Sequence, residues 1–383
     1  MHTAKIFPHV IVKNGTNRLS RKTVYSQYLF AAATLFICVL LLSITALGAY
    51  TILPAKVNYH ITKIFTIKQH AGEAQIYLGL LLPRSGPYQV VENVAVRWDG
   101  SQETSSRAYV DLLKLSAEIP RESEKLAAIE YDLALRQGGA SWQAPVDRND
   151  LLAQVGIESD NEDIQQAATW ITSETRNDPA YEIFQFTSNY LEYSETGCDD
   201  TNLSALEAFR TRTSACIGYS RLMVALCRAT GIPAKMIIGT IVPDGFFSLP
   251  QVSTSSIPGS GHAWVEYNSR NRWHLADPSC GPFYPDLLAF NRSDGQHLSF
   301  GDFDRFLVSK DELYDWATQN ASSKDIQLTS VFASNSEHTE ITSETTIRKT
   351  WDQRWLNVII ALVVAVLVLS KLRNQLISKY YPD

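Results

Sequence analysis

Cysteine is scarce in this sequence, with five residues among 383, and no two of them form a CxxC pair. The chain therefore lacks the cysteine density of a disulfide scaffold and the ligand spacing of a structural zinc site. We expect neither a metal nor another cofactor. The spacing of Cys198 and Cys280 leaves open whether these two residues form a disulfide.

Acidic side chains are absent from residues 1–27, which carry five Lys and Arg, and residues 28–53 carry no charge at all. Residues 356–370 are also uncharged. Because a helix needs about 20 apolar residues to cross a bilayer, we predict transmembrane helices at 28–53 and 353–372. The second includes Trp355 and Lys371, whose long side chain reaches the interface. A cleaved signal peptide is the alternative for the first, although its apolar stretch is longer than such peptides usually have.

The charges beside these two segments predict an orientation. Basic residues dominate both tails, 1–27 and 373–383, which places both termini in the cytoplasm by the positive-inside rule. The middle of the chain would then lie outside the cytoplasm, in the periplasm if the organism is a bacterium. Of the net charge of −6, the basic tails contribute +5 (residues 1–27) and +2 (371–383), which leaves −13 on residues 28–370. We therefore expect the lipid bilayer as a partner and no nucleic acid.

Alternating apolar and polar residues predict a small all-β domain at residues 54–140, most simply a sandwich. A second domain is expected at 141–320, where apolar residues recur at helical spacing near residues 164–171 and, after Pro179, at 181–187. Further helices are expected at 203–209, capped by Thr201 or Asn202, from Cys216 to Gly231, and at 302–318. Residues 321–352 are rich in Ser, Thr and Glu and predict a polar stalk.

Cys216 stands at the predicted start of a helix, where Thr213 or Ser214 could cap it. The positive end of a helix dipole stabilises a thiolate, which is the nucleophilic form of cysteine. The alternative is a small buried apolar side chain, which is what most free cysteines are. We interpret Cys227, eleven residues later on the same helix, as such a core residue.

His262 and Asp277 lie in two predicted strands that flank Asn268-Ser269-Arg270-Asn271. If these four residues are the loop of an antiparallel hairpin, His262 stands directly opposite Asp277 on the same face of the sheet. The carboxylate could then orient the imidazole and stabilise its protonated form. An exposed His–Asp pair with no catalytic role is the alternative, and a one-residue change in the turn would break the register.

Three motifs in this order resemble the transglutaminase-like superfamily. They are SACIGYSRLMVALCRATGIPAK at residues 214–235, GHAWVEY at 261–267, and WHLADPS at 273–279. The resemblance covers residues 160–290. Ser214 stands where the family usually has Gly, and Lys235 where it usually has Arg.

This resemblance implies an α+β, papain-like fold in which Cys216, His262 and Asp277 form a catalytic triad. Cys216 would attack an amide or peptide carbonyl of a protein or peptide substrate outside the cytoplasm, and the oxyanion would be held by the Cys216 backbone N–H and by Tyr193 or Tyr190 on the preceding helix. The attack would leave a thioester acyl-enzyme, which either water or an amine could resolve. We favour hydrolysis over transfer to an amine.

Three aromatic residues, Phe246, Phe247 and Trp264, are candidates for shaping the substrate cleft. Residues 240–259 predict a loop, either above the site or as a simple surface excursion. For Trp264 a place in the core is the stronger alternative. The alternative function is a membrane-tethered binding or assembly module without catalysis on the same fold.

Overall fold

The computed structural model describes residues 37–46, 55–107, 110–137, 141–173, 178–194, 204–241, 252–255, 261–279 and 297–380. The chain divides into two compact units. One comprises Met1–Tyr50 and Val358–Asp383, and the other Thr51–Asn357. All the named strands lie in the second unit, where they form two five-stranded sheets, one four-stranded sheet and a short two-stranded ladder.

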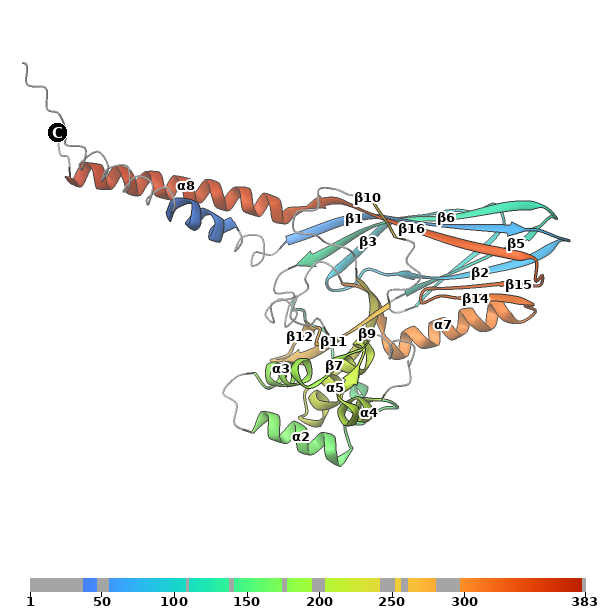
Figure 1. Ribbon diagram of the computed structural model, residues 1–383, viewed down its shortest axis with the longest axis horizontal. Coiled ribbons are helices and arrows are strands. Elements are labelled where there is room, and N and C mark those ends of the chain that lie inside the picture. Colours follow the sequence, from blue (N-terminus) through green and yellow to red (C-terminus); the bar gives the residue numbers. More distant parts are fainter. Residues whose placement is uncertain are drawn as a thin grey trace, which may run out of the picture. The chain divides into compact units, whose positions relative to one another are not determined.

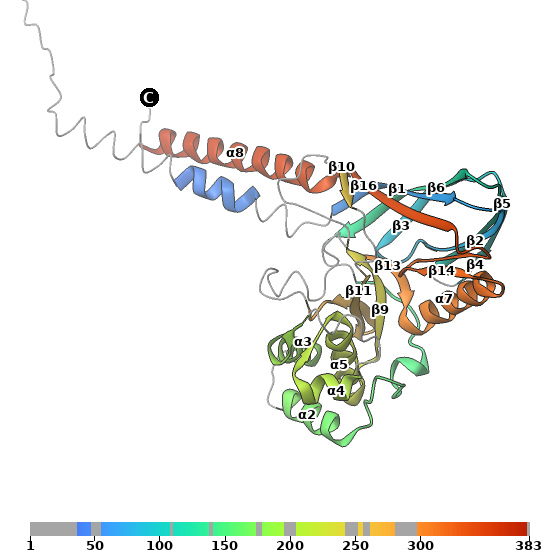
Figure 2. The same ribbon diagram turned by 45° about the vertical axis from the view of Figure 1, so that its right-hand side comes forward.

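Two antiparallel five-stranded sheets build a β-sandwich (Figures 1 and 2). The first has the order β10 (Val252–Ser255), β16 (Thr339–Asp352), β1 (Ala55–Gln69), β6 (Ser123–Gln137) and β3 (Gln89–Arg97). The second has the order β14 (Ser323–Ile326), β15 (Ser330–Ser334), β2 (Ala74–Pro83), β5 (Val110–Ile119) and β4 (Ser101–Ser106). Alternate residues of β1, such as Tyr59, Phe65 and Ile67, are buried in the core.

The segment predicted as a polar stalk, residues 321–352, is instead part of this sandwich. β16 pairs with the whole length of β1, from Val57 opposite Asp352 to Gln69 opposite Thr339. Ile341 and Ile347 are the apolar residues of β16 that reach the core, while its Thr, Ser and Glu side chains alternate with them. Because one face of an antiparallel sheet can meet water, a polar composition does not exclude a strand.

The four-stranded antiparallel sheet has the order β12 (Arg272–Ala276), β11 (Gly261–Ser269), β9 (Ala234–Ile241) and β13 (His297–Asp302). Helices gather on one side of it in both views: α2 (Glu162–Thr172), α3 (Pro179–Tyr190), α4 (Ala205–Thr211) and the central α5 (Cys216–Ala229). α7 (Phe303–Thr318) packs on β2 and β15 of the sandwich. This arrangement confirms the α+β fold class.

Local signals set the ends of these helices. Asn161 caps α2 and Asp178 caps α3 by accepting hydrogen bonds from backbone N–H groups, and Pro179 opens α3 as predicted. The cap of α4 is Ser204, which forms a capping box with Glu207, rather than the predicted Thr201 or Asn202. The last two residues lie outside the described ranges.

Helix α8 (Gln353–Tyr380) follows β16, and a short helical segment covers residues 37–46. Among the described residues, no helix has both the length and the apolar character needed to cross a membrane. The transmembrane helices predicted at 28–53 and 353–372 are thus not confirmed.

Candidate active site

Cys216 is the first residue of α5, the central helix of the group that covers the four-stranded sheet. Eleven successive residues, from Gly218 to Arg228, are buried, and α5 packs against β11 and β9. The helix ends in a glycine cap: Gly231 has a left-handed φ of 77°, and Ile232 donates to the Cys227 carbonyl at 2.9 Å. Cys216 itself is only 8% exposed.

The start of α5 differs from the prediction in one detail. Its N-cap is Ala215, which provides no side-chain hydrogen bond, whereas Thr213 and Ser214 form the short strand β8. β8 pairs in parallel with β7 (Glu192–Tyr193), so that two strands rather than a capping hydroxyl position the helix start. The first N–H groups of a helix have no acceptor within the helix. At the start of α5 such groups can stabilise an anion beside Cys216.

The β11–β12 hairpin has a shorter loop than predicted. Its turn consists of Arg270 and Asn271 alone, both with φ near 60° (54° and 61°), and Ser269 pairs with Arg272. Such a two-residue turn matches the twist of the strands better than the predicted four-residue loop. The register therefore shifts by two residues. An even shift leaves every side chain on its predicted face, and His262 and Asp277 become diagonal neighbours instead of directly opposed residues.

His262 and Asp277 meet through a short hydrogen bond. His262 Nε2 donates to Asp277 Oδ2 at 2.6 Å, and the Asp277 side chain is completely buried. The other carboxylate oxygen, Oδ1, accepts from the backbone N–H of Ser279 at 3.1 Å and from its hydroxyl at 2.7 Å. With Nε2 bound to the carboxylate, Nδ1 is the ring nitrogen that can exchange a proton with a nucleophile.

Trp264 supports the histidine ring from within the protein. The two rings are nearly parallel, 6.1 Å apart and 25° inclined. Gly239 makes room for the indole, because a Cβ there would lie 2.3 Å from a Trp264 ring carbon and 2.1 Å from the Leu298 carbonyl oxygen. Trp264 is fully buried with Tyr88, Ile237 and Leu275. Its burial agrees with the stronger alternative given for it, a place in the core.

The two tyrosines predicted for the oxyanion differ in their surroundings. The Tyr190 hydroxyl donates to the Phe209 carbonyl at 2.9 Å, and the ring is nearly parallel to those of Phe186 and Phe209, with ring centres 4.7 and 5.2 Å away. Tyr193 belongs to β7 rather than to a helix, is 49% exposed, and pairs with Ser214, two residues before Cys216. Tyr193 is thus the tyrosine that the fold brings to the start of α5.

Of the remaining cysteines and cleft candidates singled out in the sequence, Cys227 is described by the structure and the others lie outside the described ranges. Cys227 is fully buried, and burial raises the pKa of its thiol far above the ordinary value, as expected of a core cysteine. Phe246, Phe247, Cys198 and Cys280 lie outside the described residues, as does most of the predicted loop at 240–259, except that Val252–Ser255 form the edge strand β10. In the ranges that the structure describes, no cluster of His, Cys, Asp or Glu could hold a metal ion.

Sequence reasoning missed two contributions near the site. The motif at residues 273–279 does not indicate a role for Ser279, whose backbone N–H and hydroxyl both donate to Asp277 Oδ1. Lys235 lies 3.3 Å from the buried Glu266 carboxylate and 4.5 Å from the centre of the Trp273 ring. Burial raises the pKa of Glu266, and Lys235 opposes that rise. A lysine in place of the usual arginine thus still pairs β9 with β11.

Comparison with known proteins gives one family match. The family model of the transglutaminase-like superfamily matches residues 163–278, which contain Cys216, His262 and Asp277. This span runs from the start of α2 to the turn after β12. No curated protein matches the chain in sequence.

Several solved structures resemble the chain at low identity. One is a candidate cysteine protease from Cytophaga hutchinsonii, 14% identical, covering 78% of this chain and 100% of its own, with a TM-score of 0.45. Another is the periplasmic domain of TgpA from Pseudomonas aeruginosa, 17% identical, covering 61% of this chain and 90% of its own, with a TM-score of 0.26. TM-scores this low carry no inference about function.

Proposed function

Residues 163–278 form a domain of the transglutaminase-like superfamily, and from this premise we propose that the protein is a cysteine enzyme acting on amide or peptide bonds, with Cys216, His262 and Asp277 as its triad. The observation that carries the proposal is the hydrogen bond between His262 Nε2 and the fully buried Asp277 carboxylate. A buried carboxylate that orients an imidazole is the supporting half of a nucleophile–base–carboxylate triad, and the helix that begins at Cys216 packs against the strand of His262.

In the first half-reaction, His262 Nδ1 takes the proton of the Cys216 thiol, and the thiolate attacks the carbonyl carbon of the substrate amide. The resulting oxyanion is held by the Cys216 backbone N–H and by the Tyr193 hydroxyl. When the carbon–nitrogen bond breaks, the imidazolium returns its proton to the leaving amine, and a thioester on Cys216 remains. Asp277 stabilises the imidazolium throughout.

In the second half-reaction, water or an amine attacks the thioester and loses a proton to His262, and Cys216 is released. Attack by water produces a carboxylic acid, so the enzyme would be an amidase or peptidase. Attack by an amine produces a new amide, so it would be a transglutaminase. We propose hydrolysis as the main outcome.

Three incubations test this proposal. The full-length chain is incubated with a blocked glutaminyl dipeptide, alone and with dansylcadaverine, and with casein as a general protein substrate. Release of ammonia or of peptides without dansyl incorporation is expected. Dansyl incorporation would instead identify a transferase, while no turnover on any of these substrates would favour the non-catalytic binding module.

We also propose that the catalytic domain lies outside the cytoplasm and is anchored at residues 28–53 and 353–372. The support is the uncharged sequence with its basic flanks and the exposure of apolar side chains around α8. More than half of the residue surface is exposed at each of four apolar residues, Ile359, Val363, Val366 and Leu367, as expected of a helix in an apolar environment.

The protein is expected to resist extraction from membranes by alkaline carbonate. Its catalytic domain is expected to be digested by protease added from the non-cytoplasmic side. Release by carbonate, or protection of that domain, would contradict the proposal.

A further inference from the structure

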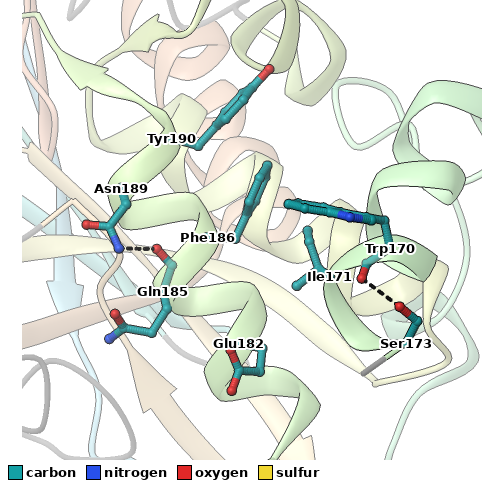
Figure 3. A pocket seen from close by; sticks show the side chains of 8 residues that line it. All are labelled: Trp170, Ile171, Ser173, Glu182, Gln185, Phe186, Asn189 and Tyr190. Carbon is teal, nitrogen blue, oxygen red and sulfur yellow. Dashed lines mark hydrogen bonds between the residues drawn. The ribbon is translucent and has the colours of Figure 1, made fainter. Parts of the chain in front are cut away.

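A hollow of about 540 Å³ lies between α2 and α3, on helices that carry none of the triad residues (Figure 3). Its volume is in the range of ligand sites, roughly 300–1,000 Å³. Its walls come from Trp170, Ile171 and Ser173 of one segment, and from Glu182, Gln185, Phe186, Asn189 and Tyr190 of α3. A second hollow of about 370 Å³ shares Trp170 and Ser173 with the first.

Aromatic rings form one side of this hollow. Trp170 is 70% exposed, and its ring stands nearly perpendicular to that of Phe186 at 6.2 Å. Phe186 is stacked on Tyr190 at 4.7 Å (Figure 3). Trp170 thus lines both hollows, and tryptophan is one of the residue types enriched among binding hot spots.

The aromatic row already binds one cation within the chain. The Arg212 guanidinium lies over the Tyr190 ring, 4.9 Å from its centre. Cations are attracted to the faces of aromatic rings, and tryptophan attracts them more strongly than tyrosine does. The same chemistry is therefore available at the other end of the row, at Trp170, where the indole meets solvent.

The charge of this region selects the same class of ligand. Residues 151–195 contain nine Asp and Glu and a single Arg, within a middle part of the chain that is itself strongly acidic. Glu182 brings a carboxylate to the wall of the hollow, and Gln185 and Asn189 add amide side chains next to it on α3. Arg212 already lies over the Tyr190 end of the row, so a ligand cation would bind at the Trp170 end, attracted by the indole and by the Glu182 carboxylate.

From these observations we infer that the hollow between α2 and α3 docks a basic segment of a partner polypeptide, with a Lys or Arg side chain placed against Trp170 and Glu182. Arginine suits the site best, because its planar guanidinium stacks on aromatic faces and pairs with a carboxylate. Docking requires no catalytic group, so it can hold or fail independently of the proposed enzymatic function. A neutral saccharide could also stack on an indole, but it would not make use of the acidic surroundings.

Binding of labelled peptides to the full-length chain tests this inference. The probes are a fluorescein-labelled octapeptide of alternating Gly and Arg or Lys, the same peptide with Glu in place of each basic residue, and an oligomer of N-acetylglucosamine. Of the three probes, only the basic peptide is expected to bind saturably, as measured by fluorescence anisotropy. Its affinity is expected to fall as the salt concentration is raised. The Glu peptide and the sugar are expected not to bind.

Three variants locate the site. Trp170→Ala is expected to weaken binding of the basic peptide by about tenfold, and Glu182→Gln by about threefold to tenfold. Glu162→Gln, which removes an equal charge from the exposed first turn of α2 outside the hollow, is the matched control and should change affinity less than about twofold.

Other results would overturn the inference. One is the absence of saturable binding by the basic peptide. A second is an equal loss of affinity in Glu162→Gln and Glu182→Gln with no loss in Trp170→Ala. A third is binding of the sugar instead of the basic peptide. Alkylation of Cys216 should be the same in all three variants, which separates loss of docking from loss of the catalytic fold.

Discussion

Replacement of Cys216 by alanine is expected to reduce amide or peptide turnover on the order of 10⁴-fold or more, because the thioester can no longer form. Alanine leaves the small volume and the start of α5 unchanged, since Ala215 already caps the helix without a side-chain hydrogen bond. Turnover is measured on whichever substrate proves active, with unfolding monitored in parallel. The unfolding midpoint should shift little.

Cys227→Ala provides the matched control for this variant. Cys227 belongs to the same helix but is buried among the core residues, so its truncation should lower stability by about 1 kcal/mol or more and leave turnover per folded molecule close to that of the wild type. Turnover that survives in Cys216→Ala, or that falls equally in Cys227→Ala, would contradict the assignment of the nucleophile.

Exchange of Asp277 for asparagine is expected to lower turnover by about 10²–10⁴-fold. The carboxylate holds His262 Nε2 at 2.6 Å, and an amide at that position can neither stabilise the imidazolium nor select the same tautomer. The change should appear in the catalytic rate more than in the apparent substrate affinity, because Asp277 is buried and acts through His262.

Ser279→Ala is the companion to this experiment. It removes the hydroxyl that donates to Asp277 Oδ1 but leaves the carboxylate and the backbone N–H donor in place. We expect a reduction of turnover of about tenfold, in keeping with about 1.5 kcal/mol for one hydrogen bond to a charged acceptor that keeps its other bonds. If Ser279→Ala is as damaging as Asp277→Asn, Asp277 acts through the local structure rather than through its charge.

The candidate triad could be predicted because its residues lie in motifs with strong local signals. A helix that ends at Gly231 and Pro233, and two strands around a polar turn, specify the helix of Cys216 and the hairpin of His262 without long-range information. Even the wrong loop length left His262 and Asp277 on one face, because the register error was an even number of residues.

The contributions that were missed depend on contacts between distant parts of the chain. β16 pairs with β1 from nearly 300 residues away, and nothing local distinguishes its Ser- and Thr-rich sequence from a stalk. The packing of Trp264 depends on Gly239 in a neighbouring strand and on Tyr88 of the sandwich loop. Such neighbours cannot be identified from spacing along one strand.

Alkylation of the individual thiols tests the central claim most directly. The full-length chain is treated with iodoacetamide near neutral pH, and modification of Cys216 and Cys227 is followed over time by mass spectrometry, in the wild type and in His262→Ala. We predict that Cys216 reacts first, and at least about tenfold more slowly once the imidazole is gone. A Cys216 that stays unmodified, or that reacts equally fast without His262, would show that the two residues do not act together.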